Sequence, residues 1–436
     1  MDIYVVQPGD TIISIANKFG IPAYQLIQDN GLENTVNLAH GQAIVITYPT
    51  KTHIVQEGDT LQSISEMYGI TLLQLLRNNS FLSDREYIYP GETLVISYDT
   101  HGKKLVTNGY AYPFISHNTL IKVLPYLTYL SVFNYRILDA GEVISYNDDT
   151  QLIESAVTYG TIPLLMISAM SPQGDVDVEM VYELLLNKEY QNRLISNMLT
   201  ILKATKYQGI NIMISTMNEI NQELYFSFLT KISNLLAQEN YLIFYTINPN
   251  LRYEDNEIKF ERIDYLKISP NVDGFTFFQY VWGKKTGPPA PVNSIALINV
   301  FLKHIVTIIP PELVSVGEPL IGYDWELPYI PGRTTVNSVT INTAIKIAYD
   351  ADANIDFDTI SQTPYFNYQF SFSASPIDHI VWYIDPRSIE ALNSLIDKYQ
   401  LQGSGIWNIM IFYQPLWSIL NSQYELVKLL PDRLQS

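Results

Sequence analysis

Cysteine is absent from the 436-residue sequence, which excludes disulfides, thiolate metal sites and cysteine nucleophiles. Histidine is scarce too, and its six copies are scattered, with no pair at the spacing of metal ligands. We therefore expect neither a metal site nor another cofactor. The histidines are His40, His53, His101, His117, His304 and His379.

Long apolar runs are also missing, since no stretch approaches the roughly 20 residues that a membrane-spanning helix needs. The start of the chain, MDIYVVQPGDT, lacks the basic residues and the apolar run of a signal peptide. We expect synthesis in the cytoplasm without a signal peptide, no membrane partner, and a route other than general secretion for any surface role.

Positive charge is in short supply, because 26 Lys and Arg face 44 Asp and Glu, a net charge of -18 at pH 7. A nucleic-acid partner is not expected, since neutralising phosphates requires clustered Lys and Arg. The same balance disfavours anionic surfaces, whereas a neutral glycan remains compatible. Hydrophobic residues make up 47% of the chain and charged residues 16%, so a buried core is expected.

A tandem repeat occupies the first hundred residues, where Val5–Ile21 aligns with Ile54–Ile70 at an offset of 49. Each unit has the pattern strand, Gly-Asp-Thr turn, helix, glycine stop, second helix and closing strand. Asp10 and Asp59 stand where a helix N-cap is expected. Gly20 and Gly69 stand where helices end in the left-handed conformation.

Both repeats resemble LysM modules, βααβ units that bind N-acetylglucosamine-containing glycans. We place the modules at residues 1–49 and 50–99. The resemblance implies a shallow sugar groove between the loop after the first strand and the loop after the second helix. The alternative is that its Asp and Gly residues only cap helices and shape turns. The implied groove residues are Gly9, Asp10, Thr11, Ile12 and Asn30 in the first module and Gly58, Asp59, Thr60, Leu61 and Asn79 in the second.

After a short polar linker, apolar runs alternate with helical patterns from residue 104 to residue 436. Eight such runs predict a (β/α)₈ TIM barrel of the α/β class, with strands covered on both faces. A gap of about eighty residues before the last strand predicts a small α+β insertion at about 326–378. The predicted strands are 106–115, 129–134, 163–169, 209–215, 242–247, 274–280, 315–321 and 405–411.

The fourth predicted strand lies in the stretch Tyr207–Tyr225, YQGINIMISTMNEINQELY. Strand alternation puts Asn211, Met213 and Ser215 on one face. The stretch resembles the fourth strand of the chitinase-type (family 18) glycoside hydrolases, most closely the LysM-bearing glucosaminidases that trim spore cortex peptidoglycan. Their motif reads Gly-x-Asn-x-Asp-x-Glu, so Met213 occupies the Asp position and Ser215 the catalytic Glu position. Further stretches that carry the resemblance are NGYAYPF, LPYLTYLSVFNY, YVWGKKTGPPAPV, GYDWELPYIPG and WYIDPRS.

The resemblance implies substrate-assisted hydrolysis, in which a Glu protonates the leaving oxygen and the substrate's acetamido group attacks the anomeric carbon. Tyr280 keeps the phenol that holds this acetamido group, and Trp407 keeps the stacking floor. Val281 stands where the family has an acid, and neither Met213 nor Ser215 can supply the missing carboxylates. The residues implied in the barrel cleft are Tyr110, Asn211, Tyr280, Trp282, Trp325 and Trp407.

These replacements predict a pseudoenzyme, a glycan-binding or structural protein of a bacterial spore envelope (cortex, coat or exosporium). Its expected partners are an N-acetylglucosamine-containing glycan, such as peptidoglycan or a chitin-like polymer, and other spore-envelope proteins. The alternative is an active N-acetylglucosaminidase with a relocated acid, either Glu318 inside an apolar strand or Glu219 near the next helix start. Structural explanations compete for both, a local partner for Glu318 and helix capping for Glu219.

Overall fold

The computed structural model describes residues 1–32, 38–85, 87–170, 176–254, 257–278, 287–334, 336–370 and 376–430, with the side chain of Asp84 left out. No helix within these ranges has both the length and the apolar character needed to cross a membrane.

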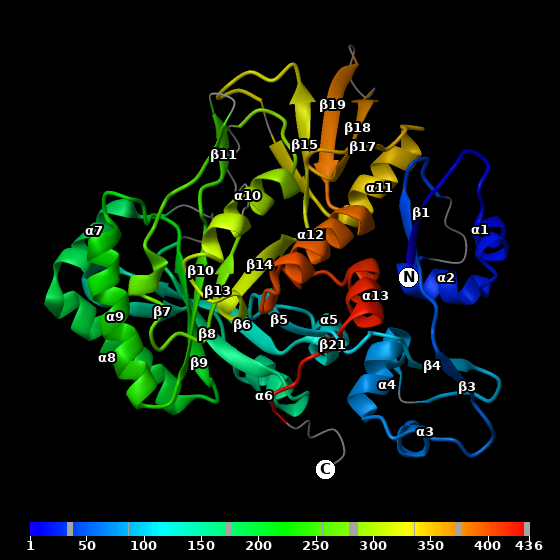
Figure 1. Cartoon of the computed structure of the whole chain (residues 1–436), viewed down its shortest axis with the longest axis horizontal. Coiled ribbons are helices and arrows are strands. Elements are labelled where there is room, and N and C mark those ends of the chain that lie inside the picture. The colour runs from blue at the N-terminus through cyan, green and yellow to red at the C-terminus, as the bar shows by residue number, and fades with distance from the viewer. Residues whose placement is uncertain are drawn as a thin grey trace.

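Eight parallel strands of the described chain form a closed barrel (Figure 1). The first strand of the ring pairs with both the second and the last, and these two pairings close it. This confirms the predicted TIM barrel. The strands are β5 (Lys104–Ala111), β6 (Tyr129–Ile137), β8 (Ile162–Ser168), β9 (Gly209–Ile214), β10 (Leu242–Ile247), β13 (Gly274–Phe277), β14 (Val314–Pro319) and β20 (Gly403–Trp407).

Helices cover the outside of the barrel, because the outward side chains of the strands are apolar. In β9, Ile210, Ile212 and Ile214 belong to the large outer core, whereas Met213 belongs to a separate cluster inside the ring. The alternation predicted for this strand is confirmed. The helices are α5 (His117–Val123), α6 (Thr150–Thr158), α7 (Val178–Leu186), α8 (Lys188–Ala204), α9 (Gln222–Gln238), α10 (Ile295–Ile305), α12 (Pro386–Tyr399) and α13 (Gln414–Gln423).

An antiparallel sheet of five strands and one helix is inserted between β14 and α12, in the order β16-β15-β19-β18-β17. The predicted α+β insertion therefore exists, and it rises above the barrel in Figure 1. Its elements are β15 (Gly322–Leu327), β16 (Val336–Val339), α11 (Ile341–Asp350), β17 (Asp356–Asp358), β18 (Thr363–Phe370) and β19 (Ile377–Tyr383).

The two repeats have the expected βααβ order, each with its two strands paired antiparallel. The exact domain limits at 49, 99 and 104 stay predictions. The first module consists of β1 (Asp2–Val5), α1 (Ile12–Phe19), α2 (Ala23–Asn30) and β2 (Ala43–Ile46). The second consists of β3 (Lys51–Ile54), α3 (Leu61–Tyr68), α4 (Leu72–Asn78), the 3₁₀ turn η1 (Ser80–Asp84) and β4 (Thr93–Ser97).

Short elements complete the described chain. They are β7 (Val143–Ser145), β11 (Arg252–Glu254), β12 (Glu257–Lys259), β21 (Glu425–Leu426), η2 (Leu124–Tyr126), η3 (Asp139–Gly141), η4 (Tyr265–Lys267) and η5 (Pro311–Leu313).

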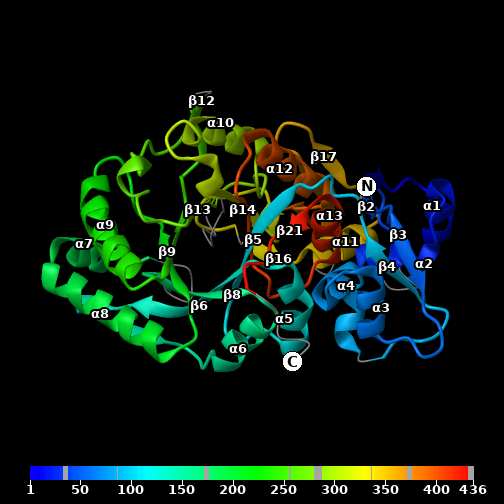
Figure 2. The same cartoon turned by 60° about the horizontal axis from the view of Figure 1, so that its bottom comes forward.

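Both modules pack on the same side of the barrel, next to α11 and α13, in the two views of Figures 1 and 2. Module 1 is joined to the insertion, where the Ile355 amide donates to the carbonyl of His40 at 2.9 Å. A Cβ added at Gly41 would lie only 2.1 Å from the Ile355 carbonyl oxygen, so the glycine permits this close contact. The modules and the barrel are therefore packed against each other.

Candidate functional site

The turn after the first strand of each module carries most of the predicted sugar-contact residues. The N-cap of the helix that follows this turn differs from the prediction. Thr11 and Thr60 are the N-caps, each accepting from the backbone N–H of the serine three residues later. Asp10 and Asp59 therefore do not cap these helices, and that prediction is wrong. Threonine suits the position because its hydroxyl reaches the first unpaired helical N–H groups.

Asp10 and Asp59 instead hold the turn itself. The Asp10 carboxylate accepts from the Gln7 N–H and from the Tyr4 hydroxyl, both at 2.7 Å. Asp59 accepts from the Gln56 N–H at 2.7 Å and lies 2.8 Å from Nε2 of His53. The backbone hydrogen bond is the main cause that lowers the pKa of each aspartate.

The turns remain reachable from solvent. Gly9 and Gly58 have φ values of 87° and 88°, a conformation that glycine adopts without strain, and no atom crowds either one. Both glycines and both cap threonines are exposed, whereas Ile12 and Leu61 are half-buried at the start of their helices. A ligand therefore has access to this part of the predicted groove in both modules.

Asn30 and Asn79, the remaining predicted groove residues, are buried structural links. The Asn30 amide donates to the carbonyls of Leu26 and Val45 and accepts from the Val45 N–H at 2.7 Å. Asn79 makes the same three bonds in module 2, with Leu75 and Val95. Their amides tie the second helix to the closing strand, so sugar contact at these positions would compete with those bonds.

A neutral hydrogen-bonded network fills the barrel interior around Tyr110 and Asn211. Both residues are fully buried, and the Asn211 amide donates to the Tyr110 hydroxyl at 3.2 Å and to Ser131 at 2.9 Å. Thr246 lies 2.7 Å from the Tyr110 hydroxyl and donates to the Asn211 oxygen at 2.8 Å. Ser131 donates in turn to Asn108. These two predicted cleft residues therefore belong to the framework of the barrel.

An apolar cluster lies beside this network and includes Met213, Trp407, Phe133 and Phe278. Met213 is 8% exposed and Trp407 is 9% exposed, and the Trp407 ring lies 5.5 Å from the ring of Tyr110. Ser215 follows the end of β9 and is exposed. The predicted residues Tyr280, Val281 and Trp282 lie outside the described residues.

Trp325 lies in the insertion rather than in the barrel. It is 3% exposed, and its indole N–H donates to the carbonyl of Gly287 at 3.2 Å. Its ring centroid lies 5.8 Å from that of Tyr323 on the same face of the sheet. The hydrogen bond from the Trp325 indole to Gly287 joins the insertion to the chain that follows β13.

Glu318 points away from the barrel interior. It shares its side of β14 with Val314 and Val316, which belong to the outer core, whereas a Cβ at Gly317 would meet Phe278 inside the ring. Burial raises the pKa of Glu318 to about 8, and the Ser404 hydroxyl donates to it at 3.3 Å. Its other oxygen has no hydrogen-bond partner among the described residues. A relocated catalytic acid at Glu318 would face the helix layer, so this candidate does not fit the cleft.

Glu219 lies at the carboxyl-terminal side of the barrel, in the loop between β9 and α9. It does not cap the helix, because α9 has Asn221 as its N-cap. Its carboxylate accepts from the Arg262 N–H at 3.0 Å, and its own N–H donates to Glu261 at 3.4 Å. Glu261 lies 3.5 Å from the guanidinium of Arg252. Glu219 and Glu261 thus lie in neighbouring loops, linked through the backbone N–H of Glu219, on the side where barrel enzymes place their active sites.

Sequence reasoning missed Asn108, Ser131, Thr246 and Glu261. The first three occupy inward positions of their strands, a signal that alternation along β5, β6 and β10 contains. Glu261 follows two short strands without any local pattern, so only the folded loop brings it to Glu219. Among the described side chains, no group of three or more His, Asp and Glu is arranged to hold a metal ion.

The fold defines a class of protein, a TIM barrel that carries two βααβ modules at its amino terminus. Residues 170–410 match the family described as glycosyl hydrolases family 18, and residues 4–47 and 53–97 match the LysM domain. The chain belongs to glycosyl hydrolases family 18 and carries two LysM domains.

Relatives match the whole chain. The cortical fragment-lytic enzyme of Bacillus subtilis (strain 168) is 30% identical, with 98% of this chain and 99% of that protein covered. The cortical fragment-lytic enzyme of Bacillus anthracis is 27% identical over the same shares. The crystal structure of the Bacillus cereus spore cortex-lytic enzyme SleL superposes with a TM-score of 0.77, at 27% identity, covering 98% of this chain and 99% of that one.

These names overturn one prediction made from the sequence. The chain was expected to be a pseudoenzyme because Met213 and Ser215 replace two carboxylates of the motif. Its full-length relatives are named as lytic enzymes, so the expectation of an inactive barrel is wrong. The loss of two side chains at β9 is therefore an insufficient reason to exclude catalysis elsewhere in the same cleft.

Proposed function

We propose that this chain is a glycosidase of the bacterial spore envelope that binds and cleaves N-acetylglucosamine-containing glycan of the cortex peptidoglycan type. One observation carries the proposal. The chain aligns from end to end, both modules and the barrel included, with relatives named as cortical fragment-lytic enzymes. The substrate class and the spore location are taken from this likeness.

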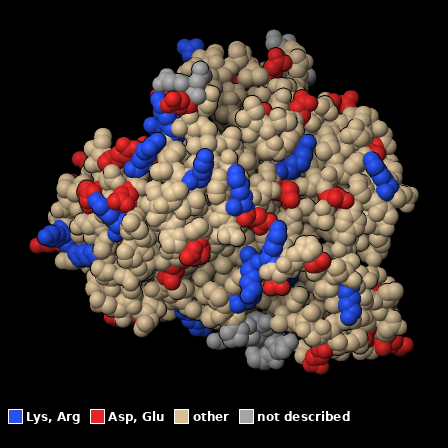
Figure 3. All heavy atoms as spheres, in the orientation of Figure 1, with Lys and Arg blue, Asp and Glu red and all other residues tan. Residues whose placement is uncertain are grey.

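The LysM modules supply binding in this proposal. Their two exposed Gly-Asp-Thr turns have the same geometry, so each offers the same backbone groups to a sugar. Figure 3 shows Lys and Arg interspersed with Asp and Glu over a largely uncharged face. Such a surface suits a glycan of low charge better than it suits a polyanion. We expect binding to depend little on salt.

Catalysis requires a proton donor for the leaving oxygen, and Ser215 cannot provide one at neutral pH. Of the two acids singled out from the sequence, Glu318 faces the outer core, whereas Glu219 lies at the strand ends. We therefore assign the general acid to Glu219. The substrate's acetamido oxygen would attack the anomeric carbon as the C–O bond breaks, and water would then open the oxazolinium.

Turnover is expected to be slow. The resemblance assigns stabilisation of the oxazolinium to a carboxylate at the position of Met213, whose thioether bears no charge. Loss of one electrostatic contact of this kind typically costs roughly 10² to 10³ in rate. The assay must therefore use long incubation and a high concentration of the protein.

The test is release of new reducing ends from cortex fragments by the full chain. Glu219→Gln should abolish release, whereas Glu318→Gln should leave it. Glu223→Gln is the matched control, because this exposed residue of the first turn of α9 pairs with Lys267 at 2.6 Å. Absence of release by the wild-type chain would refute the proposed function. Release that survives Glu219→Gln would refute the assignment of the acid.

A further inference from the structure

Two neighbouring cavities lie between module 1, module 2, the insertion and the loop after the last barrel strand. Their volumes are about 420 and 440 Å³, within the range typical of small-molecule sites. We treat these two adjoining cavities as one groove, because part of their lining is shared. The shared residues are Asn30, Gly31, Leu32, Asn342, Tyr413 and Pro415.

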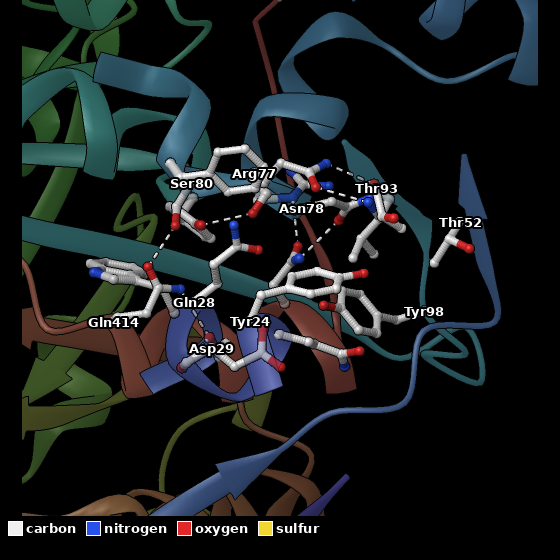
Figure 4. Close-up of a pocket in the computed structure, with 18 residues that line it drawn as sticks. Tyr24, Gln28, Asp29, Thr52, Arg77, Asn78, Ser80, Thr93, Tyr98 and Gln414 are labelled. Atoms are coloured by element: carbon white, nitrogen blue, oxygen red, sulfur yellow. Dashed lines mark hydrogen bonds between the residues drawn. The ribbon is translucent and has the colours of Figure 1, made fainter. Parts of the chain in front are cut away.

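The floor of this groove is formed by the end of α2 and the start of α13. Gly31 ends α2 with a φ of 59°, and a Cβ added there would lie 3.0 Å from the Cβ of Gln414. Ser80, which follows α4 of module 2, donates to Gln414 at 2.5 Å, and Figure 4 shows the two side chains meeting. The residues after the second helix of both repeats, Gly31 and Ser80, thus line one groove.

The wall on the insertion side is the exposed face of α11. Tyr349 is 42% exposed and lines the groove together with Asn342 and Lys346. Lys346 lies 2.6 Å from Asp350, so the charges on this wall are paired. The Asn342 amide makes no hydrogen bond among the described residues, which leaves its donor and acceptor free for a ligand.

We propose that this groove binds one linear N-acetylglucosamine-containing glycan strand, running from α11 past module 1 to module 2. The inference rests on the proposed function for its substrate class. An extended trough with an aromatic side chain, a free amide and paired charges fits a polymer of uncharged sugar rings. It is formed jointly by modules and barrel, so neither part contains it alone.

The groove has a consequence for the barrel. Phe412 and Tyr413, in its wall, follow Trp407 by only five and six residues along the loop after β20. A strand bound in the groove therefore lies on the side of the barrel where the strands end. The modules would then present the same strand to the barrel that they bind.

Binding of N-acetylglucosamine oligomers to the full chain, measured by calorimetry, tests the inference. Tyr349→Ala should weaken hexasaccharide binding about three- to tenfold, as expected for loss of one aromatic contact, and leave disaccharide binding unchanged. Asn342→Trp should block the groove and produce a larger loss for the hexasaccharide. Tyr253→Ala is the control, since this residue is also exposed but lies on β11.

The inference is overturned if both groove variants bind every oligomer as the wild-type chain does. Both altered residues are exposed, so melting temperatures should match the wild type and establish folding. The outcome is independent of hydrolysis. A length-dependent loss in a chain that releases no reducing ends would support the groove and refute the proposed function.

Discussion

The guanidinium of Arg77, at the end of α4 in module 2, donates from Nε to the side-chain oxygen of Asn421 in α13 at 2.9 Å. The Asn421 amide donates back to Asn78 at 2.8 Å, and the Tyr126 hydroxyl donates to the Arg77 carbonyl at 2.7 Å. Although Arg77 is partly exposed, burial lowers its pKa to about 10, which leaves it charged at neutral pH. Module 2 and the barrel are thus joined by a charged residue of module 2 that is hydrogen-bonded to α13 and to Tyr126.

Replacing Arg77 should destabilise the whole chain. The Arg77 guanidinium also donates from Nη1 to the carbonyl of Pro125 at 3.4 Å. Arg77→Ala therefore leaves this carbonyl and Asn421 without their donor and removes packed methylenes. We expect a loss of about 1–3 kcal/mol in the free energy of unfolding. Urea denaturation followed by tryptophan fluorescence measures it. Arg193→Ala is the control, because this exposed residue lies 3.6 Å from Glu142 and its loss should cost less than about 0.5 kcal/mol. Equal effects of the two changes would contradict the account of the junction.

Glu318 should make stability depend on pH. Its pKa is about 8 in the folded chain and near 4.5 when unfolded, so the native state binds the proton more tightly. Its stabilising contribution is complete below pH 4.5 and is lost as pH rises towards 8. The glutamine in Glu318→Gln stays neutral at every pH. The free energy of unfolding of the variant should therefore rise relative to that of the wild type by about 1.4 kcal/mol per pH unit within this window. Denaturation curves at pH 5 and pH 8 give the difference. A constant difference would mean that Glu318 is ionised in the native chain.

The helix caps of the two modules should contribute equally. Thr60→Ala removes the acceptor for the Ser63 N–H, and the expected cost is about 1 kcal/mol. Thr60→Ser keeps the hydroxyl and should retain most of the stability that Thr60→Ala loses. Thr11→Ala is the matched change in module 1, with the same bond to Ser14 at 3.0 Å. Differential scanning calorimetry compares the stabilities of these variants. An unchanged stability of Thr60→Ala would show that the cap does not contribute to stability.

Strand alternation carried much of the fold prediction. Ile210, Ile212 and Ile214 already marked the outward face of β9, and similar runs located all eight barrel strands. The repeats identified the modules because a second copy at a fixed offset cannot arise from local composition. The same alternation places Glu318 on the outward face of β14, together with Val314 and Val316. Glu318 was a catalytic candidate only because it is an acid in an apolar strand.

Other features had no local signal. Asp10 and Thr11 are adjacent and both can cap a helix, so only the folded turn decides between them. The groove depends on the packing of α2 against α13 and on α11 lining the same cavity, although α2 is hundreds of residues away from both in the sequence. The expectation of an inactive barrel rested on Met213 and Ser215 of one strand, and the names of the full-length relatives contradict it. The contact between Glu219 and Glu261 had no local signal either, because it forms only between two folded loops.

Restoring the missing carboxylate should accelerate the reaction. Ser215→Glu places an acid at an exposed strand end, and a gain of about 10² in rate is a modest part of what general acid catalysis supplies. Met213→Asp alone should destabilise the fold, since Met213 is packed among Phe133, Trp407 and Phe278. Reducing-end assays and melting curves separate the two effects. No gain from Ser215→Glu would indicate that substrate does not reach the end of β9.

Hydrolysis by this chain is measured by mass spectrometry of cortex fragments incubated with the full chain in water enriched in heavy oxygen. We expect shorter fragments whose new reducing ends carry one heavy oxygen atom, formed by the wild type and the Glu223→Gln control and not by Glu219→Gln. Fragments of unchanged length with the wild-type chain, under conditions where its two LysM modules bind them, would contradict this expectation.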